Sequence, residues 1–168
     1  VQECFGSLQG KTLTYLGDGN NMAHSLLLGG ALTGLNVRIA TPKGYEPAPE
    51  IVKQAQAIAE GRSEIVVTQD AIAAVEDAQV VYTDVWASMG QEDLADQRIP
   101  IFQPYQVNSQ LLHQADPEAI ILHCLPAHRG EEITPEAIES DRSRVWDQAE
   151  NRMHAQKALL ASLLGTRE

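Results

Sequence analysis

Short apolar runs alternate with segments of helical periodicity along almost the whole chain, and this alternation limits the possible folds more than any other feature. Strands that alternate with helices form a mostly parallel sheet with helices packed on both faces. We therefore expect a doubly wound α/β fold, a Rossmann-like three-layer sandwich of about five strands. The expected strands are 12–16, 37–40, 65–68, 80–83 and 120–123, with a weaker candidate at 99–102.

Helical patterns lie between and after these runs, at 21–32, 49–60, 71–75, 108–114, 135–139 and 148–164. Gly34 suits a left-handed C-cap after the first of these helices, and Asp70 suits an N-cap for the third. The stripe of the last helix that is expected to pack comprises Ala155, Ala158, Leu159 and Ser162. No internal repeat or low-complexity linker interrupts the pattern, so we expect residues 1–168 to form a single domain.

The charge balance excludes several classes of partner. Twelve basic against 23 acidic residues give a formal net charge of −11, whereas nucleic acids and anionic membranes require a basic surface. No apolar run approaches the ~18 residues of a membrane span. Cys4 and Cys124 form no CxxC pair, and the histidines show no HExxH-type spacing. The sequence therefore indicates a cytoplasmic protein with neither a disulfide framework nor a metal.

Three expected strands end in small, polar or reactive residues. The strings are GDGNN at 17–21, DVWASMG at 84–90 and HCLP at 123–126. Ligands of wound α/β sheets bind at the carboxyl ends of the strands. The three strings together therefore predict a site for a small molecule.

The GDGNN string opens the first long helix. Gly17 and Gly19 permit a tight turn, Asn20 or Asn21 can cap the helix, and free N–H groups there favour an anion such as a carboxylate. Capping without a ligand is the simpler alternative. A dinucleotide fingerprint fails, because Met22 occupies its third glycine position and the second strand does not end in an acid.

The DVWASMG string places a carboxylate beside a hydroxyl and a flexible glycine. Asp84 and Ser88 could hold an ammonium group and Gly90 could let the segment move as a lid. The alternative is a solvated loop in which Asp84 caps a turn and Met89 plugs the core.

The HCLP string and one arginine complete the candidates. Cys124 is either a small buried residue or a thiol whose reactivity the surroundings tune, with His123 and His128 nearby in sequence. Arg152 is expected at the start of the last helix, either as a surface ion pair or as a guanidinium that reaches toward an anionic substrate.

These strings, taken in order, resemble the ornithine-binding domain of the ornithine carbamoyltransferases. The resemblance runs from LQGKTLTYLGDGNNMAHSLL through TPKGYEP, DVWASMGQE and HCLPAHRGEEI to WDQAENRMHAQKALL, and so covers essentially the whole chain. It implies a carbamoyl transfer from carbamoyl phosphate to L-ornithine, which gives L-citrulline and phosphate without a metal or an organic cofactor.

The resemblance also implies roles for individual residues. Asn21 corresponds to the side chain that holds the ornithine α-carboxylate, and Asp84, Ser88 and the Met89 backbone correspond to partners of the α-ammonium. Cys124 corresponds to the cysteine beside the δ-amino group, with a proton-accepting or orienting role. The contacts to carbamoyl phosphate correspond to Cys124, Leu125 and Arg152.

Family members carry a Ser-Thr-Arg-Thr phosphate loop and a His-Pro-x-Gln motif in a preceding domain, and neither string occurs here. We therefore expect this chain alone to be inactive and to require that carbamoyl-phosphate-binding domain. The family implies a homotrimer for the complete enzyme, whereas we expect this chain alone to be monomeric. An amino-acid-binding module without a catalytic role is the alternative, and a nucleotide-binding domain is a third.

Overall fold

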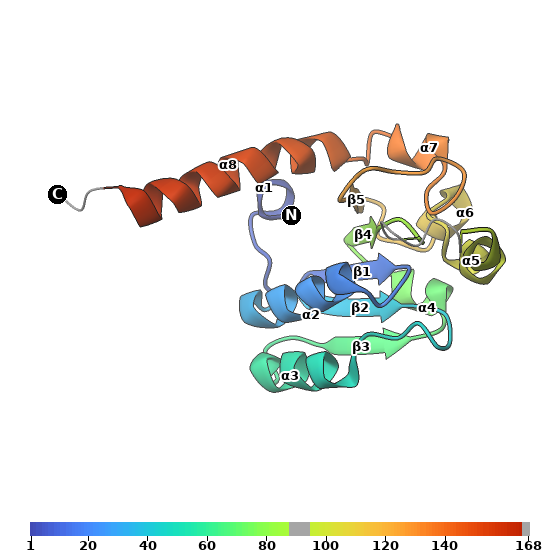
Figure 1. Cartoon of the computed structure of the whole chain (residues 1–168), viewed down its shortest axis with the longest axis horizontal. Coiled ribbons are helices and arrows are strands. Elements are labelled where there is room, and N and C mark those ends of the chain that lie inside the picture. Colours follow the sequence, from blue (N-terminus) through green and yellow to red (C-terminus); the bar gives the residue numbers. More distant parts are fainter. Residues whose placement is uncertain (88–94, 166–168) are drawn as a thin grey trace.

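A five-stranded parallel sheet forms the centre of the protein (Figure 1). The computed structural model describes residues 1–87 and 95–165 of the chain. The strand order is β3-β2-β1-β4-β5, and all four neighbouring pairs are parallel. This confirms the expected doubly wound α/β fold. The strands are β1 (Thr12–Leu16), β2 (Asn36–Ala40), β3 (Ile65–Thr68), β4 (Val80–Thr83) and β5 (Ile120–His123).

Helices cover both faces of the sheet. On one face α2 (Asn21–Thr33) and α3 (Pro49–Ala59) pack against side chains such as Tyr15 and Ile39. On the other face α4 (Ala71–Val75), α6 (Ser109–Leu112) and α7 (Pro135–Ile138) pack against side chains such as Leu16 and Ile121. Because successive strand residues point to opposite faces, the strands are apolar on both sides. The remaining helical elements are α1 (Gln2–Phe5), α5 (Ala95–Phe102), the 3₁₀ turn η2 (Gln103–Tyr105) and α8 (Val145–Leu164).

The expected caps are present. Asp70 accepts a hydrogen bond from the backbone N–H of Ala73, and Gly34 has the left-handed φ of 75° that ends α2. Of the two candidate asparagines before α2, Asn20 is the N-cap and accepts from the N–H of Met22. The sequence signals for turns therefore fixed the ends of these helices correctly.

The expected weak strand at 99–102 is wrong, because these residues form the second half of α5. Arg98 and Phe102 are both buried, four positions apart, whereas Ile101 between them is 42% exposed. This spacing places the two buried side chains on one face of a helix. The apolar run at 99–102 does not reveal this helical spacing, because Arg98, which shares the buried face, is a charged residue.

The long helix α8 also differs from expectation. It begins at Val145 rather than at 148, and it projects away from the sheet along the top of the molecule (Figure 1). The expected packing stripe of Ala155, Ala158, Leu159 and Ser162 is exposed. These side chains are exposed in the described part of the chain, so periodicity alone could not show whether they pack. None of the described helices is both long and apolar enough to span a membrane.

Candidate functional site

The order of the strands locates the candidate site. β2 and β3 lie on one side of β1, whereas β4 and β5 lie on the other, so the order in which the chain adds parallel strands reverses between the neighbours β1 and β4. At such a switch point the loops after the two strands diverge and leave a crevice at the carboxyl edge, where ligands bind. GDGNN follows β1, the described residues 84–87 follow β4, and HCLP begins at the last residue of β5, so the fold brings these segments to one edge.

The GDGNN turn is tightly seated. The N–H of Gly19 donates to the carbonyl of Tyr45 at 2.8 Å, and a Cβ on Gly19 would lie 2.3 Å from the nitrogen of Pro47. Only glycine fits so close to another backbone segment. Asn21 occupies the first turn of α2 and is exposed, while the amide nitrogen of Asn20 is buried with no partner among the described residues. The turn thus presents side-chain amides at the edge of the crevice.

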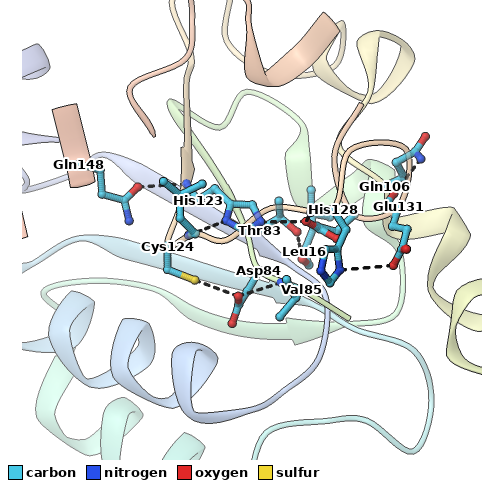
Figure 2. Close-up of polar contacts among 12 residues, drawn as sticks. Leu16, Thr83, Asp84, Val85, Gln106, His123, Cys124, His128, Glu131 and Gln148 are labelled. Carbon is cyan, nitrogen blue, oxygen red and sulfur yellow. Dashed lines mark hydrogen bonds and ion pairs between the residues drawn. The ribbon is translucent and has the colours of Figure 1, made fainter. Parts of the chain in front are cut away.

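Asp84 and Cys124 meet directly across β4 and β5 (Figure 2). The Cys124 Sγ lies 2.9 Å from Asp84 Oδ1, which also accepts from the N–H of Val85 at 2.8 Å. Burial, and then the negative charge of Asp84, raise the pKa of Cys124 to about 12. Cys124 is therefore a neutral thiol near pH 7, and its S–H donates to the carboxylate of Asp84.

Two tyrosines flank this pair. Burial raises the pKa values of Tyr15 and Tyr82 well above the ordinary value for a phenol, with smaller contributions from the charge of Asp84. The Tyr82 hydroxyl accepts from Nε2 of Gln148 at 2.8 Å. Both phenols are neutral, so neither of them offsets the charge of the Asp84 carboxylate. Such a carboxylate favours a cationic ligand.

A buried pair of side chains, His123 and Glu132, joins the start of the HCLP turn to the loop that follows it. Nε2 of His123 lies 3.1 Å from Oε1 of Glu132, and neither side chain is exposed. The N–H of Leu125 donates to Nδ1 of His123 at 2.8 Å, so that nitrogen carries no proton and Nε2–H must donate to Glu132. Glu132 also accepts from the N–H of His128. These bonds hold the imidazole in one tautomer. Through the N–H of Leu125 they also hold the backbone that follows Cys124 in place.

The HCLP turn departs from strand geometry directly after Cys124. Leu125 has a left-handed φ of 58°, and the Leu125–Pro126 peptide bond is cis. Pro126 has no N–H to donate, so ladder pairing ends here. The backbone of Leu125 consequently turns toward α8 rather than continuing the sheet.

An open cleft of about 1100 Å³ lies between this turn and α8. Its lining includes Cys124, Leu125, Arg129 and Arg152. Arg152 is two turns into α8 and not at its start, which corrects our expectation, and its guanidinium is exposed. The structure thus brings Cys124, Leu125 and Arg152 to one cleft. Ser88 and Met89 lie outside the described residues.

Two groups of side chains have the composition of metal ligands. Potential ligand atoms of Asp84, His123 and Cys124 lie within 4.8 Å of one another, as do those of His128, Glu131 and Glu132. Both ring nitrogens of His123 already have hydrogen-bond partners, and the Cys124 thiol already donates to Asp84. A metal ion at the first group would have to break at least one of these bonds and deprotonate the thiol.

Sequence reasoning missed Glu132 and Gln148 as supports of the site. Glu132 stands in the string HRGEE beside a second glutamate, and charged letters in a row indicate an exposed loop rather than a buried side chain. Gln148 was placed at the start of the last helix, but its contact with the Tyr82 hydroxyl joins residues far apart in sequence. Nothing in the neighbouring sequence marks either residue as a support of the site.

Comparison with known proteins identifies the family. The family model for the aspartate/ornithine carbamoyltransferase Asp/Orn binding domain matches residues 9–163. The chain belongs to this family. The ornithine carbamoyltransferase of Nostoc sp. is 69% identical over 165 residues, and that of Synechocystis sp. is 67% identical; each match covers 98% of this chain and 54% of the relative.

Solved structures of the family have the same fold. The ornithine carbamoyltransferase of Pyrococcus furiosus superposes with a TM-score of 0.94 at 50% identity, covering 99% of this chain and 54% of that one. The enzyme of Gloeobacter violaceus gives a TM-score of 0.90 at 50% identity, with 98% and 55% covered. The chain therefore spans about half the length of the family members that it matches.

Proposed function

We propose that this chain is the ornithine-binding half of an ornithine carbamoyltransferase, formed as a single domain by residues 1–168. The reaction is the transfer of the carbamoyl group of carbamoyl phosphate to the δ-amine of L-ornithine, which gives L-citrulline and phosphate. The observation that carries the proposal is the part-buried contact of Cys124 with Asp84 at the switch-point edge, within a chain that is 69% identical to a protein of that enzyme name.

The chemistry of the amine explains what the site must do. The δ-amine of ornithine resembles that of lysine, with a pKa of ~10.4, so its deprotonation at pH 7 costs about 4.6 kcal/mol. Asp84 is 8% exposed and its Tyr15, Tyr82 and Cys124 neighbours are neutral, so it attracts an ammonium group. We assign the α-ammonium to Asp84 and Ser88 and to the backbone of Met89, and the α-carboxylate to Asn21. The δ-amine then lies beside Cys124.

The state of Cys124 narrows its role. With a pKa of about 12 the group is a thiol that already donates to Asp84, so it does not accept the proton of the amine at neutral pH. Its role is to orient the Asp84 carboxylate, which binds the α-ammonium and also accepts a proton from the δ-ammonium group beside Cys124. Of the two roles that the resemblance offers, the orienting role fits this contact.

Carbamoyl phosphate is assigned to the cleft beside α8. The backbone and side chains of Cys124 and Leu125 form one wall of that cleft, and the guanidinium of Arg152 can bind a phosphate oxygen. Phosphoryl and oxyanion charge require several preorganised donors, and Arg152 supplies one cation. We infer that a carbamoyl-phosphate-binding domain supplies the rest, that this chain alone is inactive and monomeric, and that the complete enzyme is a homotrimer.

We infer a role in arginine biosynthesis within the cytoplasm. Cys4 and Cys124 are both free, which fits a reducing compartment. The proposal requires no metal or organic cofactor, because approximation of two bound substrates supplies about 7–11 kcal/mol of a barrier.

A chimaera tests the proposal. This chain replaces the matching segment of the Nostoc sp. ornithine carbamoyltransferase, and citrulline formation from carbamoyl phosphate and L-ornithine is measured. We expect turnover by the chimaera and none by this chain alone. Calorimetry with L-ornithine accompanies the assay. Binding without turnover by the chimaera would favour an amino-acid-binding module, and absence of both would refute the proposal.

A further inference from the structure

A buried arginine on α5, Arg98, contacts motifs at the carboxyl edge of the sheet. Arg98 is 7% exposed and forms an ion pair with Asp18 of the GDGNN turn. Its guanidinium carbon lies 4.9 Å from the ring centre of Tyr45 and 5.1 Å from that of Phe102. A planar cation that pairs with a carboxylate and stacks on rings is a task for arginine rather than lysine.

Tyr45 belongs to the string TPKGYEP, which borders the GDGNN turn from the other side. Its carbonyl accepts from the N–H of Gly19 and from the hydroxyl of Thr41, each at 2.8 Å. Its ring meets that of Phe102 edge-on, with centres 4.8 Å apart. The TPKGYEP segment therefore bonds to the turn through the backbone of Tyr45 and packs against α5 through the Tyr45 ring.

The segment that carries Asp84 joins the same cluster. Trp86 is 1% exposed, and its ring stacks on that of Phe102 with centres 6.0 Å apart and an interplanar angle of 28°. Asp84 lies two residues before it. One guanidinium and three aromatic rings thus connect the turn after β1, the loop after β2 and the segment after β4. In Figure 1, α5 lies beyond the arrowheads of the strands, at the carboxyl edge of the sheet.

Electrostatics give Arg98 a second task. Burial raises the pKa of Asp18, and the negative charge of Asp84 adds to this rise, whereas the charge of Arg98 and its hydrogen bond lower that pKa. Arg98 therefore opposes the rise in the pKa of Asp18 and pairs with this second carboxyl group near Asp84. Loss of the guanidinium would leave the Asp18 side chain, which is only 16% exposed, without its cation and would favour a shift of the turn that hydrates it better.

We propose that Arg98 is a positioning residue of the ornithine site, which holds the GDGNN turn and the Asp84 segment in register through Asp18, Tyr45 and Phe102. The proposal rests on the proposed function, because the turn carries Asn21 and the buried amide nitrogen of Asn20. Arg98 does not touch the substrate. It sets the distance between the groups assigned to the carboxylate and to the ammonium of the same ligand.

The test uses the chimaera and measures both substrates. Arg98→Met is expected to raise the KM for L-ornithine about 10- to 100-fold, as misplacement by about 1 Å does. The KM for carbamoyl phosphate should stay within about twofold. Arg98→Lys keeps the charge but not the planar fork, so it should recover part of the loss. The double variant with Asp18→Asn should be no worse than Arg98→Met alone, because the two side chains act as one unit.

Arg38→Met is the matched control. Arg38 donates to the carbonyls of Ala74 and Glu76, and its loss should lower stability without a change in either KM. The positioning role is overturned if Arg98→Met raises both KM values alike or neither, or if the double variant multiplies the single effects. Should Arg98→Met fail to fold, Arg98→Lys and Asp18→Asn carry the same comparison.

A separate readout distinguishes this proposal from the proposed function. If the unsubstituted chimaera forms no citrulline, the proposed function fails, and hydrogen exchange of the amides of 19–22 then tests Arg98. We expect faster exchange there in Arg98→Met than in Arg38→Met. Equal rates in the two variants would contradict the positioning role.

Discussion

The two walls of the candidate site are built differently. Around Asp84 and Cys124 the side chains are buried and bonded to one another, and the His123–Glu132 pair fixes the turn behind them. Along α8 the cleft is open, Arg152 is exposed, and the apolar side chains farther along the helix reach 71% exposure at Leu163 and 79% at Leu164.

The difference indicates which of the two ligands this chain can recognise with its own residues. A buried, preorganised wall can recognise a ligand without further partners, because its groups are already oriented. An exposed arginine on an open cleft recognises a phosphate weakly, because water screens its charge. We therefore propose that this chain carries the specificity for ornithine and contributes only a share of carbamoyl phosphate binding.

The largest expected effect is on the buried wall itself. Glu132→Leu leaves the Nε2–H of His123 and the N–H of His128 without their acceptor, which should cost about 2–5 kcal/mol of unfolding free energy. Glu132→Gln keeps an acceptor oxygen and should cost less than half as much. Glu139→Leu removes a glutamate that is 54% exposed and pairs with Arg129, and should cost less than about 1 kcal/mol. Urea unfolding of the three variants decides, and equal costs would contradict the structural role of Glu132.

Asp84→Asn should separate the two substrates. Loss of the carboxylate is expected to raise the KM for L-ornithine in the chimaera about 100-fold, because a buried charge partner of the ammonium group is removed. Binding of carbamoyl phosphate should change little. Steady-state kinetics with each substrate varied in turn provide the measurement, and equal losses for both substrates would refute the assignment of Asp84.

Arg152→Met should show the opposite selectivity with a smaller effect. We expect the KM for carbamoyl phosphate to rise about tenfold, as for one charge-assisted bond at an exposed site. The KM for ornithine should hardly change. Arg142→Met, which removes an arginine bonded to the carbonyl of Leu112, is the matched control. A rise in the ornithine KM alone would place Arg152 on the other wall.

The smallest effect belongs to the end of α8. Leu163→Ala in this chain should change the unfolding free energy by no more than about 0.5 kcal/mol, because the side chain is 71% exposed. Leu27→Ala, at a leucine with no exposed surface in α2, should cost about 2–5 kcal/mol. Calorimetric melting of both variants tests the contrast. A large loss for Leu163→Ala would mean that this helix packs against the domain.

Much of the fold was predictable because its signals are local. All five strands of the sheet and the caps at Asn20, Gly34 and Asp70 follow from apolar runs and from turn chemistry. The error at 99–102 has a physical cause, since Arg98 is buried by an ion pair with Asp18 and by the ring of Tyr45, both from distant segments, as well as by Phe102 on its own helix. The packing of α8 is equally nonlocal.

The motifs of the candidate site could be predicted from the sequence, but the residues that hold those motifs in place could not. GDGNN, DVWASMG and HCLP could be placed at one sheet edge, because the carboxyl ends of parallel strands share an edge. The contact of Cys124 with Asp84 depends on β4 and β5 being neighbours, and the strand order is not written in either string. Three polar residues contribute through contacts inside the protein: Glu132, Gln148 and Arg98. Charged and amide residue types do not by themselves indicate such burial.

Alkylation of Cys124 tests the central claim most directly. In the chimaera with inorganic phosphate, the modification rate of Cys124 by iodoacetamide is followed by peptide mass spectrometry, with exposed Cys4 as the reference. Because the pKa of Cys124 is raised to about 12, its rate should keep rising with pH beyond 9, and L-ornithine should slow it about tenfold. Asp84→Asn should speed the reaction and abolish the protection. Equal rates with and without L-ornithine would contradict the assignment of ornithine to this wall.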